Sequence, residues 1–81
     1  MNELLLTIIS PEKELFQGEI QRITLPGVMG AFTILPQHAP VVSSLNAGKL
    51  SFVKANGTEE TLEINGGFIE MSMNNVSVCI N

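Results

Sequence analysis

The sequence has few of the residues that nucleic-acid binding and disulfide formation require. Its fixed cations are limited to Lys13, Arg22, Lys49 and Lys54, and its net charge is −4 with a pI near 4.7. Binding to a phosphate backbone needs clustered basic residues, so no nucleic-acid partner is expected. Cys79 is the only cysteine and cannot form a disulfide within the chain. We expect it to pack as a small apolar residue or to lie on a strand face without a reactive role.

Long apolar runs and targeting signals are also missing. No run approaches the roughly 20 apolar residues that span a bilayer, so any membrane contact is expected to come through a partner. The N-terminal residues lack the basic start and the small-residue cleavage site of a secretory signal, which predicts a cytosolic protein. With 81 residues, the chain is expected to form one small domain over residues 1–81.

The titratable residues do not indicate a catalytic site or a metal site. The acidic residues are all glutamates, and His38 is the only histidine. Ser43, His38 and a glutamate could be written as a triad, but nothing in their spacing orients a base against a nucleophile. One histidine beside prolines offers a single metal ligand. We therefore expect no catalytic residue, no metal and no cofactor.

For His38, a structural role, such as a hydrogen bond to a loop carbonyl, is favoured over an interface or catalytic role. A phosphocarrier or small enzyme that uses His38 as the acceptor is an alternative, although such a site requires a second histidine or a cationic anion nest. A generic β-sandwich adaptor is a further interpretation of the chain as a whole; it fits the composition but does not explain the Pro36-x-His38-Ala39-Pro40 stretch.

Hydrophobic residues repeat with a period of two through most of the chain, which predicts an all-β protein. We expect a flattened β-sandwich or barrel of about eight to ten short antiparallel strands, with no helical domain. The expected strands are residues 4–10, 19–25, 31–35, 41–45, 49–54, 61–64, 68–73 and 76–80. Residues 4–10 are apolar on both faces, which predicts a strand that is covered twice, and Leu15 and Phe16 are expected to re-enter the core.

Turn and bulge signals lie between these strands. Asn56-Gly57 predicts a hairpin with a type I′ turn, and Asn74-Asn75 predicts the last hairpin turn. Gly66-Gly67 predicts a sharp bend. In residues 19–25 no single register makes either face wholly apolar, which favours a bulge.

The stretch from Leu25 to Pro40 contains three prolines and two glycines and is expected to follow an irregular path around one short strand. Pro26-Gly27 reads as a turn. Val28 and Met29 lie between two glycines, where an exposed contact site competes about evenly with a folded-back loop.

Several of these motifs together resemble the epsilon subunit of F-type ATP synthases. The resemblance runs from about residue 4 to the end. It is carried by Ser10-Pro11-Glu12, Leu15-Phe16-x-Gly18, Leu25-Pro26-Gly27-x-x-Gly30, Ile34-Leu35-Pro36-x-His38-Ala39-Pro40 and Ile64-x-Gly66-Gly67-Phe68.

The resemblance implies a non-catalytic central-stalk subunit that couples the gamma subunit to the membrane c-ring. Ion-driven rotation then powers ATP synthesis in the catalytic head. It implies a peripheral position on the cytoplasmic face of the bacterial plasma membrane, and a monomer when isolated. The implied c-ring interface is Gly27, Val28, Met29, Gly30 and Ala31. The implied gamma-subunit interface is Ser10, His38, Ala39, Pro40 and Ser43.

The sequence departs from this family at three places. Many epsilon subunits continue into a two-helix hairpin that restrains ATP hydrolysis, whereas this sequence contains no helical segment, so such autoinhibition is not expected. Many members carry an acidic residue where this chain has Ala31 and a glycine where it has Gln37. Val28 and Met29 are therefore expected to contact the c-ring through apolar contact.

Overall fold

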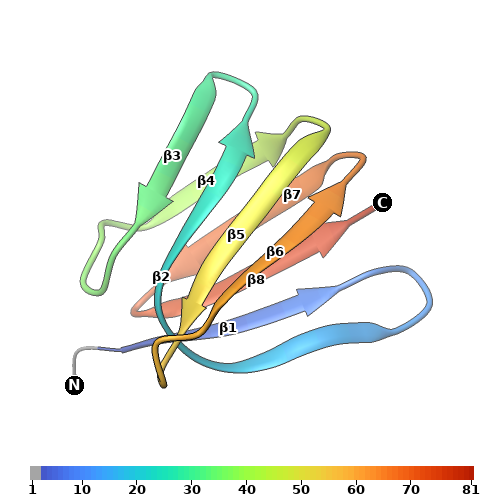
Figure 1. The fold of residues 1–81 in the computed structure, drawn as a ribbon. Helices are drawn as coiled ribbons and strands as arrows, with labels where there is room; N and C mark the ends of the chain where they lie inside the picture. Colours follow the sequence, from blue (N-terminus) through green and yellow to red (C-terminus); the bar gives the residue numbers. More distant parts are fainter. Residues whose placement is uncertain (1–2) are drawn as a thin grey trace.

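The computed structural model describes residues 3–81, which form eight β-strands and no helix (Figure 1). The strands are β1 (Leu4–Ile9), β2 (Glu14–Gly27), β3 (Gly30–Ile34), β4 (Val41–Leu45), β5 (Gly48–Lys54), β6 (Glu59–Ile64), β7 (Gly67–Ser72) and β8 (Asn75–Ile80). The all-β prediction is confirmed.

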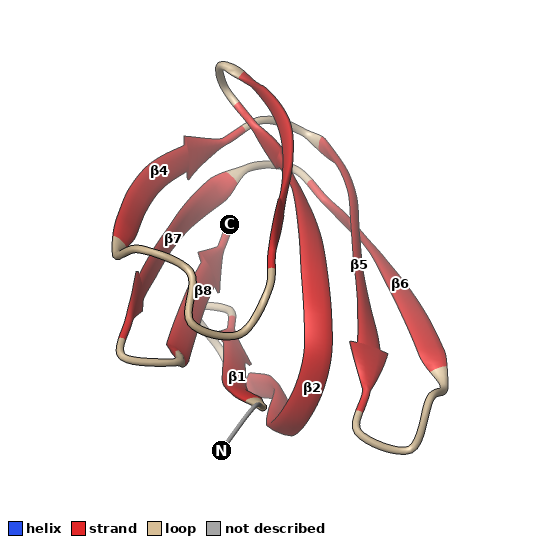
Figure 2. Cartoon of the chain, turned by 90° about the vertical axis from the view of Figure 1, so that its left-hand side faces the viewer, coloured by secondary structure: helices blue, strands red, loops and turns tan. Residues whose placement is uncertain are grey.

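The strands form one continuous sheet that folds over into two facing layers. Their order is β1-β8-β7-β4-β2-β5-β6, with β3 also paired to β2. In Figure 1, β3, β2, β5 and β6 lie in the front layer, and β4, β7, β8 and β1 lie behind them. Figure 2 shows β4, β7 and β8 on one side of the sandwich and β5 and β6 on the other.

The 14-residue strand β2 joins the two layers. Its first half, from Glu14 to Ile20, pairs with β1, and its second half pairs with β3 and β5. Because β1 pairs with β8 as well as with β2, the sheet closes on itself. The flattened sandwich is therefore confirmed, and few strand edges are left unpaired.

One pairing differs from the expected antiparallel arrangement. β1 and β8 run parallel, from Leu5 opposite Asn75 to Ile9 opposite Cys79. Parallel neighbours need a long connection, which the chain between these two strands provides. The alternation of side chains could not reveal this direction, because parallel and antiparallel strands share a period of two.

The core lies between the layers, and every strand contributes to it. On β1, Leu4, Leu6 and Ile8 are fully buried, as the alternation predicted. The prediction that β1 is covered on both faces is wrong, because Leu5 and Ile9 are exposed on the outer side. Their apolar character is therefore not explained by the core.

β2 contains the predicted bulge. Its pairing with β5 shifts register between Ile20 and Arg22 and leaves Gln21 as the extra residue. The bulge lets Ile20 and Ile23 both enter the core, although a regular strand would place them on opposite faces. At the start of β2, Phe16 packs against the core, whereas the prediction that Leu15 does so is wrong.

Pro26-Gly27 is not a turn, contrary to the prediction. Both residues end β2, and the turn consists of Val28 and Met29, flanked by the Gly27–Gly30 pair. Proline is tolerated near a strand end, where a missing N–H disrupts little pairing. Gly27 is needed for space, because a Cβ at that position would lie 2.7 Å from Cε1 of Phe32. The chain from residue 25 to residue 34 is therefore a regular hairpin.

The type I′ geometry predicted for the Asn56-Gly57 turn occurs instead in the last hairpin turn. The Asn56-Gly57 hairpin forms, but only Gly57 has positive φ, at 92°, so the turn is not type I′. The Gly57 amide donates to the Lys54 carbonyl (2.9 Å), which makes a three-residue loop. Between β7 and β8, Met73 and Asn74 both have positive φ, at 52° and 64°, as a type I′ turn requires. That turn lies one residue before the predicted position.

Gly66-Gly67 forms the predicted bend, with φ values of 140° and 148°. Gly67 begins β7 opposite Ile80 of β8. A Cβ at Gly67 would clash with the carbonyl oxygen of Cys79 and would lie 2.9 Å from the Cα of Ile80. Only glycine therefore allows β7 to start this close to β8.

Gly67→Ala should lower the free energy of unfolding by about 3 kcal/mol or more, because backbone strain and a backbone clash act together. Gly57→Ala is the matched control: its φ is also positive, but no atom lies within 4 Å of the added methyl group. It should cost only about 1 kcal/mol. Urea denaturation of both variants measures the difference, and equal losses would contradict the proposed role of the clash.

Candidate interaction surfaces

The exposed apolar side chains of the strands gather on one outer face of the sandwich. We call this the apolar face; it consists of Leu5, Ile9, Val42, Phe68 and Cys79, on the outer side of β1, β4, β7 and β8. Phe68 lies opposite Cys79, and Cys79 lies opposite Ile9, so these three side chains form a row across three strands. Phe68 is 50% exposed and Val42 is 75% exposed.

The outer face of the other layer is polar. Lys49 lies opposite Glu63 there, and Thr24 and Thr33 form a hydrogen bond of 2.9 Å between their hydroxyl oxygens. Within the described chain, β3, β5 and β6 expose no large hydrophobic side chain. Large exposed apolar areas usually mark binding sites, so the asymmetry between the two faces points to a partner on the apolar face.

The residues predicted to face the gamma subunit do not form one cluster. Ser10 follows β1, and its hydroxyl donates to the Lys13 carbonyl (3.2 Å). His38, Ala39 and Pro40 belong to the loop before β4, near the opposite end of β1 (Figure 1). The apolar face lies between these two groups.

The loop from residue 35 to residue 40 is fixed to the β7–β8 turn. The Gln37 amide donates to Oδ1 of Asn74 at 2.7 Å, and Gln37 itself has a φ of 67°. Nδ1 of His38 lies 2.7 Å from the Ala39 carbonyl oxygen. Since a carbonyl only accepts, Nδ1 must carry the proton. The favoured prediction for His38, a hydrogen bond to a loop carbonyl, is confirmed.

Ser43 was predicted at the gamma interface, but its neighbour Val42 is the residue that faces outward. The alternation along β4 puts Ser43 on the same side as the core residue Leu45. The Ser43 hydroxyl donates to the Ser44 carbonyl at 3.0 Å. Sequence reasoning missed the apolar face, although the apolar residues on both sides of β1 were a signal for it.

The residues predicted to face the c-ring form the end of the β2–β3 hairpin. Met29 is 96% exposed, and Val28 is about half exposed, so the exposed-contact interpretation fits and a folded-back loop does not. The Val28 amide donates to the Ser44 carbonyl at 3.1 Å, which anchors the tip to β4. Gly27 is buried, whereas Gly30 and Ala31 are exposed beside the tip.

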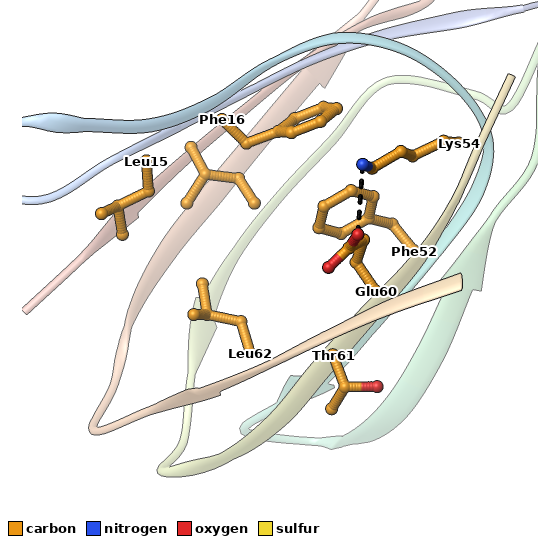
Figure 3. A pocket seen from close by; sticks show the side chains of 8 residues that line it. Leu15, Phe16, Phe52, Lys54, Glu60, Thr61 and Leu62 are labelled. Atoms are coloured by element: carbon orange, nitrogen blue, oxygen red, sulfur yellow. Dashed lines mark ion pairs between the residues drawn. The ribbon is translucent and has the colours of Figure 1, made fainter. Parts of the chain in front are cut away.

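A hollow of about 340 Å³ opens between the start of β2 and strands β5 and β6 (Figure 3). Phe16 and Phe52 form its inner wall, with ring centroids 4.6 Å apart and planes tilted by 49°. At its rim, Nζ of Lys54 pairs with Oε2 of Glu60 at 3.1 Å. The sequence did not predict this hollow, because its walls combine residues of β1 and β2 with residues of the distant strands β5 and β6.

Residues 3–81 contain no group of three or more His, Cys, Asp or Glu side chains placed to hold a metal ion. In the same residues, no helix has the length and apolar character that a membrane crossing requires. The fold and its surfaces define a small β-sandwich domain with an apolar face and an exposed apolar tip, the kind of surface that binds other proteins.

A family model described as "ATP synthase, Delta/Epsilon chain, beta-sandwich domain" matches residues 3–81. The chain therefore belongs to this family. It is 42% identical to the ATP synthase epsilon chain of Wolinella succinogenes over 79 residues, covering 96% of this chain and 60% of that one. It is 41% identical to the epsilon chain of Chlorobaculum tepidum over 69 residues, covering 85% and 78%.

Solved structures have the same fold. A chain of the Euglena gracilis mitochondrial ATP synthase, in a structure of OSCP, F1 and c-ring, superimposes with a TM-score of 0.92 at 23% identity, covering 99% of this chain and 51% of that one. A chain of the Tetrahymena thermophila central stalk and c-ring superimposes with a TM-score of 0.77 at 19% identity, covering 95% and 62%. The chain spans about 60% of the length of several curated relatives.

Phe68→Ala should change the free energy of unfolding by less than about 1 kcal/mol, because half of the side chain is already in water. The neighbouring Ile69 is fully buried, so Ile69→Ala should cost about 2–5 kcal/mol. Chemical denaturation of the two variants tests whether Phe68 serves the fold. A large loss for Phe68→Ala would assign it to the core instead of a binding surface.

Proposed function

We propose that this chain is the β-sandwich part of an epsilon-type subunit in the central stalk of an F-type ATP synthase. It couples the gamma subunit to the membrane c-ring, so that ion-driven rotation powers ATP synthesis in the catalytic head. The chain itself is non-catalytic and acts mechanically. The observation that carries the proposal is the family match over residues 3–81, joined to two separate exposed apolar surfaces on one closed sandwich.

The apolar face is assigned to the gamma subunit. It offers exposed apolar side chains at the centre, while Ser10 and the loop residues His38, Ala39 and Pro40 supply polar groups and a fixed backbone at its margins. Ser43 contributes through the backbone of β4, since its hydroxyl is bound to the Ser44 carbonyl. An apolar centre with a polar rim is the usual anatomy of a protein interface.

The hairpin tip, formed by Gly27, Val28, Met29, Gly30 and Ala31, is assigned to the c-ring. Met29 and Val28 present the apolar contact, and the two glycines keep the turn narrow. Under this proposal the chain works at the cytoplasmic face of the bacterial plasma membrane and meets the membrane only through the ring. The bacterial relatives support this location.

The two surfaces are connected through β4. Its residue Ser44 accepts the hydrogen bond from the Val28 amide at the tip, and the Asn46 amide, just after β4, donates to the Pro26 carbonyl at 2.8 Å. The same strand presents Val42 on the apolar face. A force on the tip therefore reaches the gamma-facing layer through backbone hydrogen bonds, which suits a part that must transmit torque.

Val28→Glu with Met29→Glu should weaken binding to a purified c-ring by about tenfold or more, because charges replace the apolar contact. The matched control is Ala55→Glu with Thr58→Glu, which adds the same charge in the β5–β6 loop at the opposite end of the sandwich (Figure 1). Pull-down with detergent-solubilised ring measures both. Unchanged assembly of the tip variant, with its fold intact, would contradict the ring assignment.

Val42→Lys with Phe68→Lys should abolish co-elution with the gamma subunit on size-exclusion chromatography, since both charges would lie in the buried centre of the interface. The control is Ser51→Lys with Thr61→Lys, a neighbouring pair on the polar outer face that should still co-elute. The wild-type chain should form a stable one-to-one complex. Free elution of the folded wild-type chain would overturn the proposed function.

A further inference from the structure

One carboxylate, that of Glu70, lies near the centre of the apolar face, whereas Glu19 lies at its edge, opposite Leu5. Glu70 points outward from β7, directly opposite Val42 on β4 and Ser77 on β8. Along β7 its outward neighbours are Phe68 and Ser72. Two of the most exposed apolar side chains of the face therefore border this charge.

Glu70 has no cationic partner within the described chain. The one ion pair among residues 3–81 joins Lys54 to Glu60, at the rim of the hollow described above. Arg22 and Lys49 belong to strands of the other layer, and Lys13 lies in the β1–β2 turn. Among the described residues, nothing but solvent therefore balances the charge on Glu70.

A partner that covers Val42 and Phe68 also removes water from Glu70. A carboxylate that loses its water without a counter-charge costs several kcal/mol, which would cancel much of the gain from apolar contact. Tight docking on this face therefore favours a surface that brings a cation to Glu70. The Glu70 carboxylate therefore provides specificity, because it lowers the affinity for every apolar surface that lacks such a cation.

The structure also provides space for such a cation. A hollow of about 290 Å³ lies beside Glu70 and is lined by Glu70, Ser72, Met73, Asn75 and Ser77. Its polar groups are one carboxylate, two hydroxyls and one amide, all able to accept hydrogen bonds. A guanidinium carries five N–H donors in a fixed plane, so it can use several of these acceptors, whereas an ammonium presents its charge at one point.

We infer that the hollow beside Glu70 receives an arginine side chain of the partner that docks on the apolar face. This inference rests on the proposed function, which makes that partner the gamma subunit. Phe68, Val42 and Ile9 supply the apolar contact, and Glu70 sets the register and the specificity. The carboxylate is thus a specificity-determining residue, while the unfolding of the isolated chain does not depend on it.

Glu70→Gln keeps the shape and removes the charge, so it should raise the Kd for the gamma subunit about tenfold or more, and Glu70→Arg should abolish binding. The controls are Glu63→Gln and Glu63→Arg on the polar outer face, which should bind like the wild type. The wild-type Kd should rise with salt concentration more steeply than that of Glu70→Gln. All variants should keep the wild-type unfolding midpoint.

The arginine itself is identified by charge exchange. Each exposed arginine of the gamma subunit is changed to glutamate, and one of these variants should restore binding to the Glu70→Arg chain. Wild-type affinity in Glu70→Gln, with Phe68→Lys still disruptive, would overturn this inference and leave the proposed function standing. Failure of the wild-type chain to bind gamma would overturn both.

Discussion

Strand β2 belongs to both layers of the sandwich, and the positions of the other strands depend on its pairing with each layer. Its first half pairs with β1, and its second half pairs with β3 and β5. The bulge at Gln21 resolves the conflict between these halves, because it returns Ile23 to the side of the core that Ile20 already occupies. Without the extra residue, Ile23 and Leu25 would face solvent, at roughly 1.5–3 kcal/mol of lost burial for each.

This arrangement places the two exposed apolar surfaces on different layers of the sandwich. The tip of the β2–β3 hairpin extends the front layer, and the apolar face belongs to the back layer (Figure 1). β4 connects them, since it accepts a hydrogen bond from the tip and carries Val42 on the apolar face. The chain therefore holds its two exposed apolar surfaces at a fixed separation, as the proposed coupling role requires.

Most of the fold was predictable from the alternation of apolar residues, because burial on one face imposes a period of two. The bulge was predictable for the same reason, since Ile20 and Ile23 break that period. The geometry of the turns was harder to predict from the sequence. A methionine gives no sign that it adopts a positive φ, as Met73 does, and the hydrogen bond between Asn74 and Gln37 joins residues that are distant in the sequence. The glycines around Val28 and Met29 left an exposed tip and a folded-back loop about equally expected, and the apolar face could be found only from the order of the strands.

The parallel pairing of β1 with β8 has a consequence for how the chain folds. Contacts between strands separated by nearly the whole sequence must form after a large loss of chain entropy, and such topologies fold slowly. During synthesis, β1 lacks its neighbour β8 until β8 has left the ribosome. At that stage, apolar residues in addition to Leu5 and Ile9 are exposed to solvent. A chaperone or early contact with a partner would shorten the time during which this edge can aggregate.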